Sequence, residues 1–151
     1  EKKLLSCTRD EKGRYVVKVQ VSPAEFANAL QQIYDYREER ASEIEENEDK
    51  LDIYEDRLGS YLIQLSQHGV SMTDIHTVSR LLHAIGDFER IGDHAQNIQE
   101  SAEELHEKDL HFSDAANAEL QILIAALRET LEHAFSGFAA DDPTIAMAVE
   151  P

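Results

Sequence analysis

Hydrophobic residues recur every three or four positions over most of the chain, which is the spacing of amphipathic helices. After residue 22 the pattern divides into four long segments and the start of a fifth, separated near Asp35, Gly69, Lys108 and Asp142. Around Asp35 the pattern fits either two helices or one continuous rod. Short connections between helices make neighbours antiparallel. The predicted fold class is therefore all-α, an antiparallel helical bundle.

The helix starts carry their own signals. Ser22, Ser71 and Ser113 are placed to cap three of the helices, and Asp142 before Pro143 announces the fifth. The apolar stripe expected on the fourth helix consists of Leu120, Leu123, Leu127, Leu131, Phe135 and Phe138.

Residues 1–21 alternate apolar and polar positions and predict a short β-hairpin, with strands at about 4–8 and 14–21 around a turn ending in Gly13. Such a hairpin is marginal by itself. We expect residues 1–21 to be this hairpin or an extension outside the domain, and residues 22–151 to be the helical domain.

The amino-acid composition restricts the classes of binding partner. The 14 basic and 31 acidic residues give a net charge of −17. This balance disfavours nucleic acid and direct lipid binding, since both need a basic surface. No segment has the apolar length of a membrane span. The single cysteine, Cys7, cannot form an internal disulfide, so we expect a reducing compartment.

Acidic residues gather on two successive helices. Glu48, Asp52 and Glu55 share a stripe beside the apolar line, and Glu89 and Asp93 lie one turn apart on the next helix. Gly86 and Gly92 on that helix suggest close helix approach or room for a ligand. Two such faces together would form an oxygen-rich cage for Mg²⁺, Mn²⁺ or iron. The alternative is a solvated acidic face, which is what charge runs usually are.

The run Phe88-Glu89-Arg90-Ile91-Gly92-Asp93-His94-Ala95-x-Asn97-Ile98 resembles the PhoU family, and flanking motifs resemble the PhoU-like domain of bacterial sodium/phosphate cotransporters. The resemblance implies two three-helix repeats and multinuclear metal sites built from Glu/Asp-x-x-x-Asp motifs. By position, the implied ligands of divalent or trivalent metal (iron, Mn, Mg or Zn) are Glu48, Asp52, Glu55, Glu89 and Asp93, bordered by Asn97 and His94.

A weak internal repeat with an offset of 105 residues pairs Leu30 and Ile33 with Phe135 and Phe138. It suggests a first repeat at about 22–108 and the first helix of a second at about 113–151. On this view the chain looks truncated, carries one motif pair, and exposes an apolar face that would make it a homodimer.

The expected function is regulatory and not enzymatic: a metal-binding domain attached to the membrane part of a phosphate cotransporter, on the cytoplasmic side of the bacterial plasma membrane. The alternative is a metal-free helical module docking on a transporter or sensor. Arg57 and Arg90 are expected to pair with the carboxylates. Glu103-x-x-His106 has di-iron spacing but occurs once, so we expect an exposed helix end.

Overall fold

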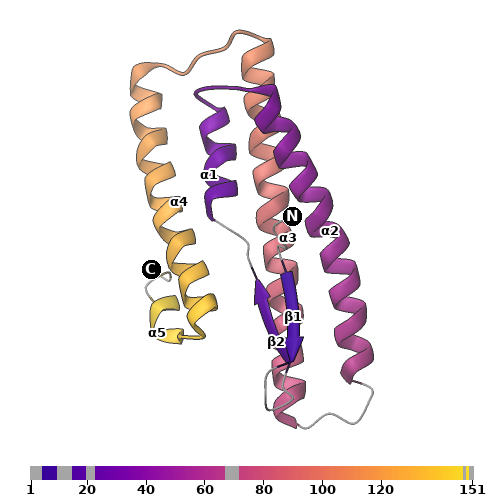
Figure 1. Cartoon of the computed structure of the whole chain (residues 1–151). Helices are drawn as coiled ribbons and strands as arrows, with labels where there is room; N and C mark the ends of the chain where they lie inside the picture. Colours follow the sequence, from indigo (N-terminus) through magenta and orange to yellow (C-terminus); the bar gives the residue numbers. More distant parts are fainter. Residues whose placement is uncertain (1–4, 10–14, 20–22, 67–71, 148, 150–151) are drawn as a thin grey trace.

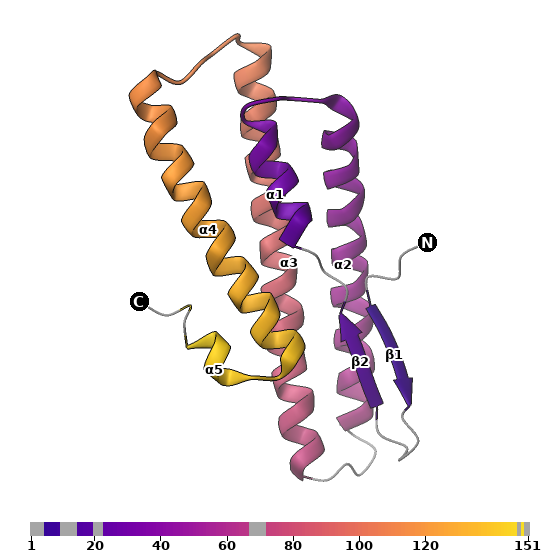
Figure 2. The same ribbon diagram turned by 60° about the vertical axis from the view of Figure 1, so that its left-hand side comes forward.

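One short and three long helices run alternately up and down in the computed structural model, which describes residues 5–9, 15–19, 23–66, 72–147 and 149 (Figure 1). The helices are α1 (Pro23–Gln32), α2 (Glu38–Ser66), α3 (Met72–Glu107), α4 (Asp114–Ala140) and the single turn α5 (Pro143–Ala146). The short α1 lies between α4 and the α2–α3 pair, in contact with all three (Figures 1 and 2). The predicted all-α antiparallel bundle is confirmed.

The segment around Asp35 forms two helices and not one rod. The buried Gln32 side chain accepts a hydrogen bond from the Arg37 backbone N–H at 2.8 Å, and its amide donates to the Arg37 carbonyl at 2.9 Å. The glutamine oxygen thus replaces the backbone carbonyl that would accept from the Arg37 N–H in a continuous helix, while the Arg37 carbonyl accepts from the Ala41 N–H of α2. Asp35 pairs with Arg37 and Arg40 instead of capping α2.

Two of the predicted caps are observed. The Ser113 hydroxyl accepts from the Ala116 N–H, and the Asp142 carboxylate accepts from the Thr144 N–H. Each satisfies an N–H that the first helical turn leaves without a backbone partner. The predicted caps Ser22 and Ser71 and the stop at Gly69 lie outside the described residues.

The core forms where α1 meets the long helices. Its buried residues are Phe26, Ala29, Leu30, Ile44, Ala95 and Ile124, with Leu120, Leu127 and Leu131 packed against them. The prediction that Leu123 belongs to this stripe is wrong, because Ile124 is buried in its place while Leu123 is 64% exposed. Ile124 continues the line from Leu120 to Leu127, and Leu123 lies outside it.

The N-terminal strands are β1 (Leu5–Arg9) and β2 (Tyr15–Val19), antiparallel with Leu5 opposite Val19 and Arg9 opposite Tyr15. They agree with the predicted hairpin, whose turn and final residue Val21 lie outside the described residues. Within the part of the chain that the structure describes, no helix has the length and apolar character needed to cross a membrane.

Candidate metal centre

A glycine of α3 lies against a buried leucine of α2. A Cβ atom built on Gly92 would lie 2.6 Å from Leu51 Cδ1, so only glycine lets Leu51 pack there without a shift. A Cβ atom at Gly86, six residues earlier, would lie 3.8 Å from the Glu55 carboxylate oxygen Oε1. The expected close approach is therefore observed at Gly92, whereas the distance at Gly86 is an ordinary van der Waals contact. The acidic faces of the two helices lie next to each other along this contact.

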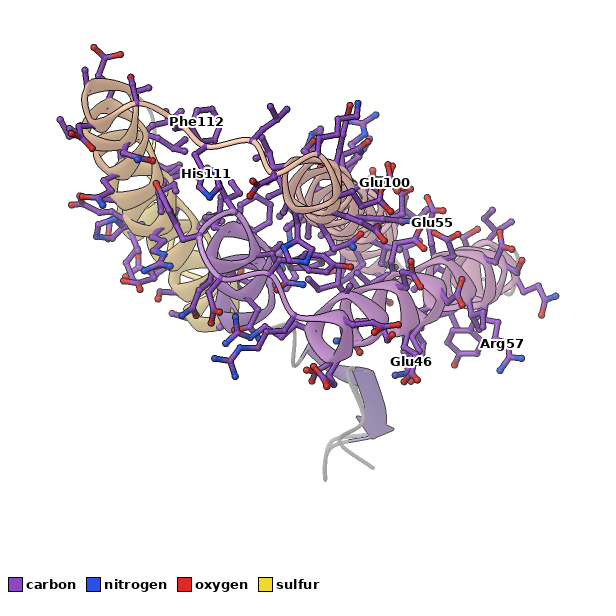
Figure 3. All side chains as sticks on the ribbon, turned by 90° about the horizontal axis from the view of Figure 1, so that it is seen from above. Glu46, Glu55, Arg57, Glu100, His111 and Phe112 are labelled. Carbon is purple, nitrogen blue, oxygen red and sulfur yellow. The ribbon has the colours of Figure 1, made fainter. Side chains whose placement is uncertain are left out.

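Five carboxylates meet along this contact. We call them the carboxylate cluster: Glu48, Asp52 and Glu55 from α2, and Glu89 and Asp93 from α3. Figure 3 shows Glu55 on the side of α2 that faces α3, whereas Glu46 and Arg57 extend from the opposite side. Glu48, Glu89 and Asp93 are half-buried, and Asp52 and Glu55 are exposed.

Electrostatics shows that the two faces act on each other. Burial, followed by the negative charges of Asp52, Asp93, Asp49 and Glu89, raises the pKa of Glu48 above its ordinary value. Burial also raises the pKa of Glu89, with further contributions from Asp93, Glu55 and Asp52 and from a hydrogen bond to Asp93. Each glutamate is thus affected by carboxylates on the facing helix, and its charged form is disfavoured.

No basic side chain compensates this charge among the described residues. The expected pairing of Arg57 and Arg90 with the cluster is wrong, since neither forms an ion pair there. Arg57 extends from the far side of α2 (Figure 3). Lys50 pairs with Glu46, outside the cluster, at 3.5 Å.

The two residues expected to border the ligands lie on the surface. His94 and Asn97 are both exposed, and the Asn97 amide donates to the Asp93 backbone carbonyl at 2.7 Å. At the end of α3, the exposed His106 stacks on Tyr36 at 4.8 Å between ring centroids, and Glu103 accepts a hydrogen bond from Gln99. Glu103 and His106 thus each make a contact near the C-terminal end of α3.

The donor set suits a hard cation. It is made only of carboxylate oxygens, which Mg²⁺, Mn²⁺ and iron favour, whereas zinc prefers nitrogen or sulfur ligands. Repulsion among uncompensated carboxylates would be relieved by a bound cation. In residues 23–66 and 72–147, however, no three His, Cys, Asp or Glu side chains stand in a ready-made ligand geometry. Side-chain rotation would be needed to complete a coordination shell.

A pocket adjoins the cluster that sequence reasoning missed. It has a volume of about 40 Å³ and is lined by Phe26, Ile44, Asn47, Glu48, Leu51, Phe88, Ile91, Gly92, Ala95 and Phe135. Its phenylalanines belong to ordinary apolar stripes, so nothing in the periodicity separates them from core residues. Only Asn47 beside Glu48, a polar pair next to a core position, could have hinted at it.

Comparison with protein families matches residues 24–102 to the PhoU domain. This range is just over half of the chain and contains all five residues of the carboxylate cluster. No curated protein and no solved structure matches the chain.

Proposed function

Because this chain belongs to the PhoU family, whose domains are regulatory and not enzymatic, we propose that it is a metal-binding regulatory domain of a sodium-dependent phosphate cotransporter. Family membership indicates a regulatory role in phosphate homeostasis. The proposal adds metal as the regulatory ligand and the transporter's membrane part as the partner, on the cytoplasmic side of the plasma membrane.

The observation that carries the metal proposal is the carboxylate cluster. Two helices hold five acidic side chains without a basic partner among the described residues, and burial, followed by the charges of the neighbouring carboxylates, raises the pKa of Glu48 and Glu89. Assembling like charges in this way costs stability. A cation supplies the missing opposite charge, and the cluster holds it with three residues of α2 and two of α3.

The transporter proposal rests on sequence resemblance. The motifs that resemble the cytoplasmic domain of sodium/phosphate cotransporters include residues 54–66 of α2, which contain Glu55 of the cluster, and residues 81–88 of α3, which end just before Glu89. The others are residues 112–116 and 149–151. A metal that ties α2 to α3 would stiffen the surface that these helices present to the membrane part.

A metal-free interaction module is the second candidate, favoured by the lack of a preformed ligand geometry in the described residues. The two candidates predict different responses to chelation. A cation that binds only the folded state adds RT ln(1 + [L]/Kd) to the free energy of unfolding, about 2.7 kcal/mol at a hundredfold excess over Kd.

The test compares melting curves with EDTA, Mg²⁺, Mn²⁺ or Fe²⁺ for the native chain, Glu89→Gln and Glu43→Gln. Glu43 is an exposed residue of α2 outside the cluster, so it is the matched control for a lost charge. We expect metal to raise the Tm of the native chain and of Glu43→Gln, and to leave Glu89→Gln nearly unchanged. Equal responses of the two variants, or no metal response at all, would favour the metal-free module.

The transporter proposal has its own test in the full-length protein. Phosphate uptake by cells carrying Glu89→Gln should depart from the native rate, whereas Glu43→Gln should not. Unchanged uptake in a variant that has lost metal binding would remove metal from the regulatory mechanism.

A further inference from the structure

The pocket beside the carboxylate cluster has a definite size and place. Helices α1, α2, α3 and α4 all line it, and its volume is about 40 Å³. A water molecule needs roughly 10–15 Å³ in such a measure, so the pocket holds about three waters or a ligand of three to four non-hydrogen atoms.

Its wall combines aromatic rings with one acid. Phe26, Phe88 and Phe135 come from α1, α3 and α4, and the remaining wall is aliphatic except for Asn47 and Glu48. We call it the aromatic pocket. Most of this lining cannot coordinate a hydrated metal ion, since metal binding needs several oxygen or nitrogen ligands. An apolar body suits it better.

The negative charge around the pocket further restricts the class of ligand that would bind there. Glu48 is half-buried at its edge, and Asp49, Asp52, Glu89 and Asp93 add negative potential to it. None of the described residues that line the pocket is a Lys or an Arg. A ligand with an apolar body and one positive charge would therefore match both the apolar part of the lining and the acidic part at Glu48.

We propose that the aromatic pocket binds a small alkylammonium group, with its alkyl part among the three phenylalanines and its N–H groups donating to the Glu48 carboxylate. Cations within about 6 Å of aromatic faces are attracted to the ring quadrupole, and this attraction is greatest where water is excluded. The N–H···carboxylate contact is a charge-assisted hydrogen bond. The site is distinct from the metal centre of the proposed function but shares Glu48 with it, so metal and ammonium compete.

The group has two possible sources, a free amine or the end of a lysine side chain on a partner. The test is an NMR titration of the native chain in EDTA, which removes the metal question. The probes are isopropylammonium, its neutral analogue isopropanol, and a blocked lysine, Nα-acetyl-lysine methylamide. A ligand of four non-hydrogen atoms binds no tighter than roughly 40 µM, so millimolar titrations are suitable.

We expect saturable shifts at the amides of Phe88 and Phe135 with isopropylammonium, and at least tenfold weaker binding of isopropanol. Tighter binding of the blocked lysine would identify a partner's lysine as the source, and tighter binding of isopropylammonium a free amine. Equal binding of isopropylammonium and isopropanol, or no saturation with either amine, overturns the proposal.

Variants locate the site. Glu48→Gln should weaken isopropylammonium at least tenfold, Phe135→Leu a few-fold, and Glu43→Gln not at all, with helical content checked by circular dichroism. Unchanged binding by both Glu48→Gln and Phe135→Leu would place the amine elsewhere and overturn the assignment. Because EDTA is present throughout, failure of the metal proposal would leave these results unaffected.

Discussion

At the scale of single residues, two buried glutamines differ in how completely their side-chain amides are hydrogen-bonded. Gln32 and Gln99 are each 1% exposed. Both ends of the Gln32 amide are hydrogen-bonded to the Arg37 backbone. Gln99 donates to Glu103, but its Oε1 has no partner among the described residues. A buried polar group stabilises the fold when satisfied and opposes it when left unpaired.

Methionine substitutions should separate the two. Gln32→Met removes two hydrogen bonds and leaves the Arg37 N–H without the oxygen that accepts from it, while the Arg37 carbonyl still accepts from the Ala41 N–H. We therefore expect a loss of about 1–3 kcal/mol in the free energy of unfolding. Gln99→Met removes one hydrogen bond together with the unpaired oxygen, so we expect a change within about 1 kcal/mol of the native chain. Urea unfolding measures both. A larger loss at Gln99 than at Gln32 would contradict this account.

The raised pKa values of Glu48 and Glu89 predict the pH dependence of stability without metal. The folded state holds these protons more tightly than the unfolded state, so their stabilising contribution is complete below the unfolded pKa, near 4.5. It is lost as the pH rises through the raised folded pKa. Above that pH, the charged carboxylates oppose folding.

In EDTA, Glu89→Gln should therefore be more stable than the native chain at pH 7, and this advantage should shrink as the pH falls through the raised pKa of Glu89 toward its ordinary value of 4.5. Denaturant unfolding across this range measures it, with Glu43→Gln as the control that should show little trend. An advantage of Glu89→Gln that does not vary with pH would exclude Glu89 as the titrating group.

At the scale of elements, the packing of α2 against α3 determines at which helix positions a side chain larger than that of glycine would fit. A Cβ at Gly92 would lie 2.6 Å from a methyl group of the buried Leu51, whereas a Cβ at Gly59 would meet nothing within 4 Å. Both glycines lie inside long helices, where alanine is intrinsically preferred by about 1 kcal/mol. We therefore expect the change in the free energy of unfolding to have opposite signs in their alanine variants.

Gly59→Ala should stabilise the chain by up to about 1 kcal/mol. Gly92→Ala should destabilise it by about 1–2 kcal/mol, because overpacking against Leu51 exceeds the gain in helix propensity. Thermal unfolding of the two variants gives the comparison. If both variants gained stability equally, α2 and α3 would not approach as closely as the structure shows.

At the scale of the whole molecule, α4 presents an apolar surface that the other described elements leave open. Ile122 is 73% exposed and Leu123 64%. We propose that this surface joins two copies in a two-fold dimer. Of the apolar face that the sequence led us to expect, it keeps Leu123, whereas Leu127 and Leu131 pack against the core. Two chains of net charge −17 repel each other, so salt should strengthen the association by screening.

Light scattering at tens of micromolar should give a dimeric mass that increases in population with salt. Combining Ile122→Glu with Leu123→Glu should give monomers, while Ile63→Glu, at an exposed apolar position on α2, should leave the mass unchanged. A monomeric native chain at every salt concentration would refute the dimer.

Local signals were sufficient for much of this fold. Helices begin where Ser113 and Asp142 cap them, and apolar periodicity identifies the bundle, because capping and amphipathicity depend on residues within a few positions of one another. The same spacing placed the acidic residues of α2 and α3 each on one face. That these two faces meet followed from antiparallel neighbours and glycines.

Tertiary structure decided what local spacing left open. The buried Gln32 side chain is hydrogen-bonded to the Arg37 backbone at the point where α1 and α2 separate. The packing of α4 against α1 places Ile124, and not Leu123, in the core. The aromatic pocket requires four helices to converge on Glu48. In each case the residue's role depends on a partner distant in sequence, and amphipathic periodicity reports which face of a helix is apolar without identifying what packs against it.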